Sequence, residues 1–140
     1  MTDKVELSIE IEASAARVWA ALTDPRLIKR YMMGADVQTD WEVGHPITWS
    51  GSYQGNAYLD KGVAMTIEPK RRLCVTHWSP LSKLVDAPEN YHLLTYNLEP
   101  NGKRTTLTLT QQNLTGVSPQ QAAKNWQPML DGLKSTAEAA

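Results

Sequence analysis

The sequence has no phenylalanine, a single cysteine and almost no excess of charge. One cysteine, Cys74, excludes an internal disulfide and fits a reducing compartment. The sequence has 14 basic and 15 acidic side chains, so their charges nearly cancel. No long-range field therefore attracts nucleic acid or an anionic membrane, and neither is expected as a partner. No run approaches the roughly 20 apolar residues that cross a bilayer, and the N-terminus alternates apolar with charged residues, unlike a signal peptide. These absences predict a cytoplasmic protein without membrane insertion.

The length of the chain, 140 residues, fits one domain spanning residues 1–140. A domain of this size buries a core without disulfides or a structural metal, and no cofactor is expected. Five tryptophans, five tyrosines and five methionines stand in a sequence without phenylalanine. Aromatic bulk is therefore not scarce, because it comes with a polar group or is replaced by a flexible thioether.

The first part of the chain predicts a strand followed by two short helices. In 5–13, apolar residues alternate with polar ones, as in a strand with one buried face. Ser14 is placed to cap a helix over 14–24, and Asp24 to cap a second helix over 24–34. Two short helices directly after the first strand suggest a clasp over one end of a sheet.

The middle of the chain predicts a meander of antiparallel strands. Six strand-like runs are separated by turn sequences, at 36–43, 46–52, 56–68, 71–79, 91–99 and 104–112. After them, apolar residues recur at helical spacing from Ser118 onward, which predicts a long C-terminal helix that covers the apolar face of the sheet. This order of elements predicts an α+β fold, with a sheet curled around one helix.

Side-chain alternation predicts which residues of the strands face that helix. His92 shares a face with Leu94 and Tyr96 on one predicted strand, and His77 shares a face with Val75 on the strand before it. Aligning Val75 with Leu94 places His77 opposite His92, within cross-strand reach. The inward sets and the helices together supply the candidate ligand-binding residues: Tyr31, Met32, Trp49, Met65, Val75, His77, His92, Leu94, Tyr96, Leu109, Trp126, Met129 and Leu130.

The histidine pair supports three interpretations. A metal site would need Asp86 or Glu89 to fold back as a third ligand, and no ligand-spacing motif is present, so no metal is expected. If the protein were an enzyme, the catalytic candidates would be His77, His92 and Tyr96, yet no nucleophile elbow, oxyanion motif or carboxylate pair accompanies them. The interpretation we favour is that the histidines form hydrogen bonds at the polar edge of a binding pocket.

Five stretches of the sequence resemble a known family: RVWAALTDP, YMMGADVQTDWEVGHPITW, EPKRRLCVTHWSPLS, APENYHLLTYNLEP and NWQPMLDGLK. They are similar to the bacterial homologues of the heat-shock protein 90 ATPase activator, in the START-like (SRPBCC, birch-pollen-allergen-like) superfamily, over nearly the whole chain. The resemblance implies a helix-grip fold, in which a curved seven-stranded antiparallel sheet grips the long C-terminal helix. It also implies a cavity between the sheet and the helix.

The function we favour is the binding of one small hydrophobic or amphipathic molecule in this cavity, with Tyr31 and Tyr96 helping to orient its polar end. A first alternative is a cyclase- or hydratase-type enzyme in the same cavity, with His77 and His92 as acid–base groups. A second, implied by the family name, is a co-chaperone-like stress adaptor that meets a chaperone partner through exposed residues such as Trp41. Fold alone does not choose among these functions, and a monomer and a homodimer both stay open.

Overall fold

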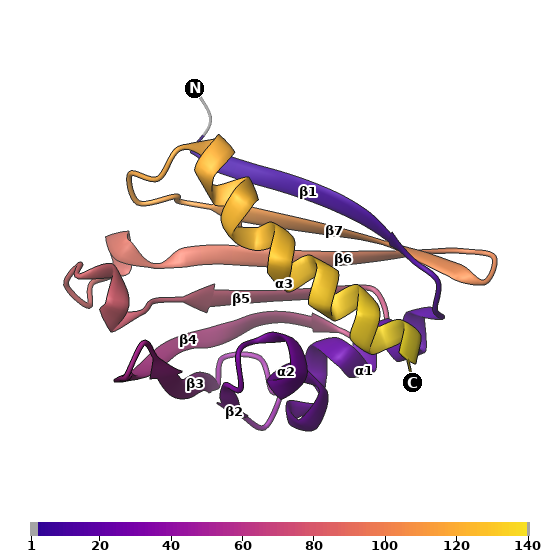
Figure 1. Cartoon of the computed structure of the whole chain (residues 1–140), viewed down its shortest axis with the longest axis horizontal. Helices are drawn as coiled ribbons and strands as arrows, with labels where there is room; N and C mark the ends of the chain where they lie inside the picture. The colour runs from indigo at the N-terminus through magenta and orange to yellow at the C-terminus, as the bar shows by residue number, and fades with distance from the viewer. Residues whose placement is uncertain (1–2, 140) are drawn as a thin grey trace.

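The computed structural model describes residues 3–139, which form a seven-stranded antiparallel sheet, two short helices and a long helix that crosses one face of the sheet (Figure 1). The strands are β1 (Lys4–Ile11), β2 (Asp36–Gln38), β3 (Pro46–Tyr53), β4 (Asn56–Glu68), β5 (Arg72–His77), β6 (His92–Asn101) and β7 (Arg104–Gln112). The α-helices are α1 (Ala15–Thr23), α2 (Pro25–Tyr31) and α3 (Pro119–Ala139), and short 3-10 turns cover Pro80–Ser82 and Pro88–Asn90. The strand order is β1-β7-β6-β5-β4-β3-β2, which confirms the predicted helix-grip α+β fold.

Both predicted helix caps are present. The Ser14 hydroxyl accepts a hydrogen bond from the backbone N–H of Arg17 (3.3 Å), and the Asp24 carboxylate accepts one from the backbone N–H of Arg26 (2.9 Å). Each cap satisfies a donor that the first turn of a helix leaves unpaired. The chain therefore turns directly from β1 into α1 and α2, and both helices pack against α3.

The second strand is much shorter than its sequence predicts, because the chain leaves the sheet after Gln38. Trp41 and Gly44 adopt left-handed backbone conformations, with φ of 58° and 87°. Such angles are incompatible with an extended strand. The segment between β2 and β3 is therefore a turn, and it directs the Trp41 side chain toward the core rather than along a sheet edge.

The C-terminal helix α3 is amphipathic and buries one stripe against the sheet. Leu130, Leu133 and Ala137 are fully or almost fully buried in one core with Ile11, Leu107 and other sheet residues. Burying a leucine or isoleucine side chain contributes about 1.5–3 kcal/mol, so this stripe holds the helix on the sheet. The other face of α3 is polar, and within residues 3–139 no helix combines the length and the hydropathy that crossing a bilayer requires.

A β-bulge interrupts the pairing of β4 with β5. Ala64 pairs with Val75, but the next pair is Thr66 with Cys74, so Met65 is an extra residue on β4. An extra residue reverses the alternation of side chains between the two faces of a strand. The bulge therefore separates two parts of β4 with opposite patterns.

The prediction that Met65 lines the cavity is wrong for this reason. Before the bulge the buried positions of β4 are Gly62 and Ala64, whereas the Met65 side chain is 50% exposed. If the alternation of side chains is extended from the end of β4 back through the bulge, it places the residues before the bulge on the wrong face of the sheet. The same shift turns Asp60 to the inside of the sheet, a residue that the alternation of the apolar positions excludes.

Candidate functional site

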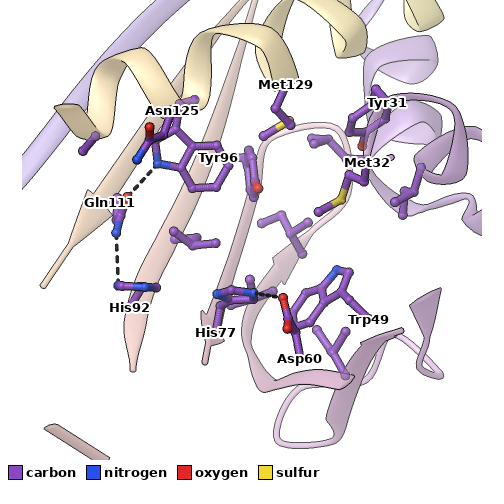
Figure 2. A pocket seen from close by; sticks show the side chains of 18 of the residues that line it. Tyr31, Met32, Trp49, Asp60, His77, His92, Tyr96, Gln111, Asn125 and Met129 are labelled. Carbon is purple, nitrogen blue, oxygen red and sulfur yellow. Dashed lines mark hydrogen bonds and ion pairs between the residues drawn. The ribbon is translucent and has the colours of Figure 1, made fainter. Parts of the chain in front are cut away.

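A cavity of about 450 Å³ lies between the sheet and the three α-helices, and Figure 2 shows side chains that line it. This volume is within the range of small-molecule sites in proteins. The walls are mostly apolar and aromatic. The lining comprises Leu22, Ile28, Tyr31, Met32, Trp41, Ile47, Trp49, Asp60, Leu73, Val75, His77, Ser82, His92, Leu94, Tyr96, Gln111, Leu114, Thr115, Val117, Ala122, Asn125, Trp126 and Met129.

Most residues that the sequence nominates do reach this cavity. Those lining it are Tyr31, Met32, Trp49, Val75, His77, His92, Leu94, Tyr96, Trp126 and Met129. Leu109 and Leu130 do not line it, because both are fully buried in the packed core. Together with Met65, they are corrections to the predicted set. The role of the lining residues in ligand binding stays a prediction.

Six polar or aromatic lining residues are absent from the predicted set: Trp41, Asp60, Ser82, Gln111, Thr115 and Asn125. A signal for Gln111 exists in the sequence, since it continues the inward alternation of Leu107 and Leu109 on β7. The inward position of Asp60 cannot be predicted from alternation, because the bulge in β4 shifts the pattern. Trp41 is half-buried and packs on the core, so it is not the exposed contact that a surface adaptor would use.

The two histidines of the cavity lie side by side on neighbouring strands. His77 of β5 pairs with His92 of β6, and Val75 pairs with Leu94, as the sequence predicts. The imidazole rings are nearly parallel, with an interplanar angle of 15° and centroids 5.8 Å apart. The edge of Trp49 meets His77 with the ring centroids 5.1 Å apart. One side of the cavity is therefore a continuous row of aromatic rings.

His77 is held by a carboxylate that lies inside the cavity wall. Its Nε2 lies 2.9 Å from Oδ2 of Asp60, and because a carboxylate only accepts, Nε2 carries the proton (Figure 2). Oδ1 of Asp60 is buried and has no hydrogen-bond partner within residues 3–139. The pair therefore orients the His77 ring and places a carboxyl group at the cavity wall.

His92 is held as a neutral imidazole with one free nitrogen. Its Nδ1 lies 2.7 Å from the backbone carbonyl oxygen of Asn113 and 3.0 Å from Nε2 of Gln111. The carbonyl only accepts, so the shorter contact assigns the proton to Nδ1. Burial lowers the pKa of His92, although the Asn113 hydrogen bond opposes this, and the neighbouring His77 lowers it further. Within residues 3–139, Nε2 has no hydrogen-bond partner, so its lone pair is available.

The two tyrosines of the cavity differ in what their hydroxyls do. The Tyr31 hydroxyl donates to the backbone carbonyl oxygen of Ala21 at 2.7 Å, so it ties α2 to α1 rather than facing a ligand. The Tyr96 hydroxyl makes no hydrogen bond to any of the residues described. Burial raises the pKa of both tyrosines, which keeps both hydroxyls protonated. Only Tyr96 is therefore free to orient the polar end of a ligand.

The loop between β5 and β6 is tied back on itself at one end of the cavity. Trp78 stacks on Tyr91 with ring centroids 6.4 Å apart, and the Tyr91 hydroxyl donates to Asp86 at 2.5 Å. Asp86 also forms an ion pair with Lys61. The carboxylate of Asp86 is thus already paired with Lys61 and Tyr91. The same loop contributes Ser82 to the cavity lining.

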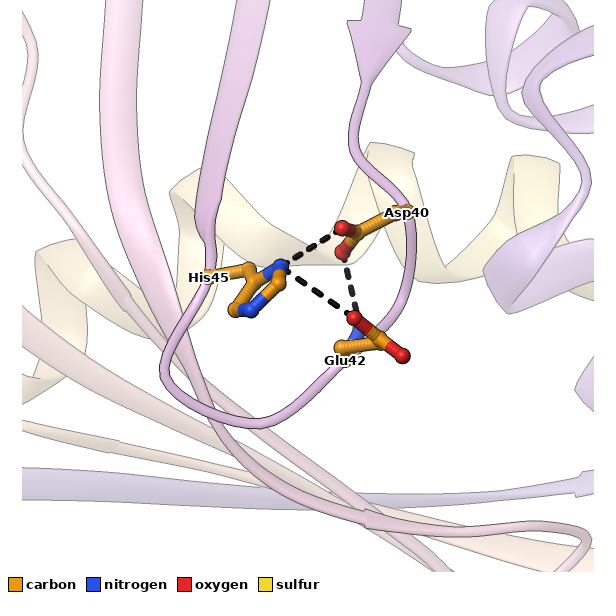
Figure 3. Close-up of side chains that lie close together, drawn as sticks. All are labelled: Asp40, Glu42 and His45. Carbon is orange, nitrogen blue, oxygen red and sulfur yellow. Dashed lines mark hydrogen bonds and ion pairs between the residues drawn. The ribbon is translucent and has the colours of Figure 1, made fainter.

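A second group of titratable side chains lies outside the cavity, in the turn before β3 (Figure 3). Asp40, Glu42 and His45 are all exposed, and their potential ligand atoms lie within 4.8 Å of one another. Nδ1 of His45 is 2.6 Å from Oδ2 of Asp40 and 3.4 Å from Oε2 of Glu42. The hydrogen bond with Asp40 raises the pKa of His45 and lowers that of Asp40. These side chains form an exposed ion-pair cluster that closes the turn.

His45 and His92 are expected to titrate on opposite sides of the usual histidine pKa of 6.5. Asp40 favours the charged form of His45, and burial favours the neutral form of His92. The stabilising contribution of neutral His92 is thus complete above pH 6.5 and is lost as the pH falls through its lowered pKa. NMR titration of the imidazole carbons measures both values.

The matched control is Asp40→Asn, which removes the carboxylate beside His45 and leaves the cavity intact. This substitution should return the pKa of His45 toward its ordinary value and leave the pKa of His92 unchanged. A His92 that titrates above 6.5 would contradict its burial as a neutral imidazole.

Comparison with known proteins gives one family. The family model described as "Activator of Hsp90 ATPase homolog 1-like protein" matches residues 12–138. No curated protein matches the chain at a significant level.

Several solved structures share the fold over nearly the full chain. The solution structure of ChR145 from Cytophaga hutchinsonii is 38% identical, with a TM-score of 0.82 and coverage of 97% of this chain and 94% of that one. CV1439 from Chromobacterium violaceum is 20% identical, with a TM-score of 0.80 and 99% of each chain covered. The Aha1 dimer from Colwellia psychrerythraea is 21% identical, with a TM-score of 0.73 and 96% of each chain covered. The last two share the arrangement of sheet and helices at low identity.

Proposed function

This chain belongs to the activator of Hsp90 ATPase homolog 1-like family, and within that family we propose that it binds one small hydrophobic or amphipathic molecule between the sheet and α3. The observation that carries the proposal is the cavity of about 450 Å³, whose walls are mainly apolar. Two polar groups of its wall, Nε2 of His92 and the Tyr96 hydroxyl, have no hydrogen-bond partner within residues 3–139. A largely apolar pocket with a few convergent polar groups is the usual form of a small-molecule site.

The affinity would come mainly from apolar contact area. Trp49, Val75 and Leu94 offer it from the sheet, and Trp126 and Met129 offer it from α3. Enclosing one large apolar group of a ligand contributes about 1.5–3 kcal/mol. Methionine side chains at Met129 and Met32 adapt to ligands of different outline. The aromatic row of Trp49 and the two histidines favours a flat ring.

A cavity-filling variant tests the proposal. N-phenyl-1-naphthylamine, an uncharged probe, should become fluorescent in apolar surroundings when it binds to the protein. Val75→Trp should reduce the bound fraction strongly, because the indole occupies the space of the ligand from β5. Ala122→Phe fills the cavity independently from α3. Fluorescence titration measures the loss, and thermal unfolding verifies that each variant is folded.

The matched control is Met65→Trp, which adds the same indole to the exposed face of β4. This variant should bind the probe as the unmodified protein does. Binding that persists in both folded cavity variants, or that is lost equally in Met65→Trp, would place the probe outside the cavity and contradict the proposal.

A second candidate function is an acid–base enzyme in the same cavity. The observation that favours it is the His77–Asp60 pair, in which a carboxylate orients an imidazole at 2.9 Å. Such a pair acts as a general base when a substrate proton lies within hydrogen-bond reach. Mass analysis of a cavity-dependent ligand after incubation separates the two functions. A binding protein returns the ligand unchanged, and an enzyme returns a product.

A further inference from the structure

We infer that the cavity selects an uncharged ring compound with a hydroxyl group and rejects carboxylates. This inference rests on the proposed function, because it names the class of ligand that the cavity would hold. Two independent features of the cavity support it. They are the charges of its walls and the hydrogen-bonding groups that the protein leaves unused.

The charged groups at the wall disfavour an anion. Among residues 3–139, no lysine or arginine lines the cavity, and Asp60 is the only acidic residue that does. The nearest cation in the sequence, Lys61, pairs with Asp86 instead. Burial lowers the pKa of His92, so its ring is neutral near pH 7. A ligand carboxylate would lose its hydration beside the Asp60 carboxyl group, and within residues 3–139 no lysine or arginine lines the cavity to compensate.

The unused hydrogen-bonding groups suit a hydroxyl. Nε2 of His92 presents a lone pair, because Nδ1 carries the proton toward Asn113. Tyr96 and Trp49 supply donors: the Tyr96 hydroxyl and the Trp49 indole N–H have no hydrogen-bond partner among residues 3–139. A ligand hydroxyl can donate to the lone pair of His92, and its oxygen can still accept a hydrogen bond.

A carboxylate can pair with the donors of the cavity wall but not with its acceptor. It can accept from Tyr96 or Trp49, but it leaves the lone pair of His92 facing its own lone pairs. Protonating His92 to remove the conflict works against burial. An ether or a bare hydrocarbon lacks the donor as well, and it leaves Nε2 of His92 desolvated and unpaired. The wall therefore discriminates by donor and by charge.

Three probes with the same ring system separate these effects. 2-Naphthol carries the hydroxyl, 2-methoxynaphthalene lacks its donor, and 2-naphthoate carries the negative charge. At pH 8, above the ordinary titration range of histidine, 2-naphthol should bind at least about tenfold more tightly than 2-naphthoate. It should also bind several-fold more tightly than 2-methoxynaphthalene. Isothermal titration calorimetry measures all three affinities.

Two substitutions assign each preference to its residue. Asp60→Asn removes the wall charge and should narrow the gap between naphthol and naphthoate. His92→Phe keeps a ring but removes the acceptor, so it should abolish the preference for naphthol over its methyl ether. Glu99→Gln removes a charge from an exposed position of β6 and should leave both preferences unchanged.

The outcomes separate this inference from the proposed function. If all three probes bind equally, the selectivity is overturned and the binding cavity stands. If naphthoate binds best, the charge argument is overturned directly. If no probe displaces N-phenyl-1-naphthylamine from a protein that binds it, the ring-hydroxyl class is overturned. If no probe of any kind binds, both proposals fall together.

Discussion

Replacing Gly62 with alanine is expected to destabilise the protein by about 3 kcal/mol, near the upper end of overpacking costs. A Cβ atom at this position would lie 1.8 Å from the carbonyl oxygen of Thr76 and 3.2 Å from the backbone nitrogen of His77. Both are backbone atoms, so no side-chain rotation relieves the overlap. At this close approach of β4 and β5, the N–H of Val63 donates to the Thr76 hydroxyl at 2.9 Å.

Chemical denaturation of the two proteins measures this loss of stability. The control is Gly55→Ala, at a turn where a Cβ meets nothing within 4 Å but φ is +81°. That variant has only the left-handed strain to bear, about 1–2 kcal/mol. If Gly62→Ala is no more destabilising than Gly55→Ala, the close contact of β4 and β5 does not exist. A folded Gly62→Ala protein should also lose probe binding, because His77 moves with its strand.

Shortening two neighbouring side chains of α3 should affect different properties: one substitution should mainly lower stability, and the other should mainly weaken probe binding. Leu130→Ala removes a fully buried side chain that does not line the cavity, and it should cost about 3 kcal/mol of stability. Met129→Ala removes a half-buried side chain from the cavity wall. It should cost less stability, because solvent already reaches that position, but it should weaken probe binding.

Thermal or chemical unfolding and probe titration on the same two variants make the comparison. We expect Leu130→Ala to lose much stability and to bind the probe with near-normal affinity, measured well below its unfolding temperature. We expect Met129→Ala to lose little stability and to bind the probe more weakly. Equal stability losses would mean that Leu130 is not part of the tightly packed core. An unchanged affinity in Met129→Ala would remove α3 from the binding surface.

Much of this architecture is predictable because local patterns repeat along the chain. Ser14 and Asp24 mark the starts of α1 and α2, since a capping side chain acts within three residues of itself. The pairing of His77 with His92 follows from alternation alone, once Val75 is aligned with Leu94. Both inferences use interactions that depend on residues close in sequence or on a regular period.

The errors in the site have two separate physical origins. The alternation of side chains places Met65 on the wrong face because a bulge adds one residue, and no residue type in 56–68 marks where the extra residue lies. Leu109 and Leu130 face inward as the pattern predicts, yet they fill the core instead of bordering a space. Periodicity distinguishes the inner face from the outer one. It contains no information on whether neighbouring side chains close the gap between them.

The sequence by itself determined the order of strands and helices and the aromatic, histidine-bearing face that the sheet turns toward α3. Only the tertiary structure decided that Asp60 forms a hydrogen bond with His77 and that the Tyr31 hydroxyl donates to the carbonyl oxygen of Ala21. It also decided that a space of about 450 Å³ remains beside Tyr96. The reason is the range of the interactions. Alternation and capping are local, whereas a hydrogen bond between strands and an unfilled volume depend on how distant segments approach one another.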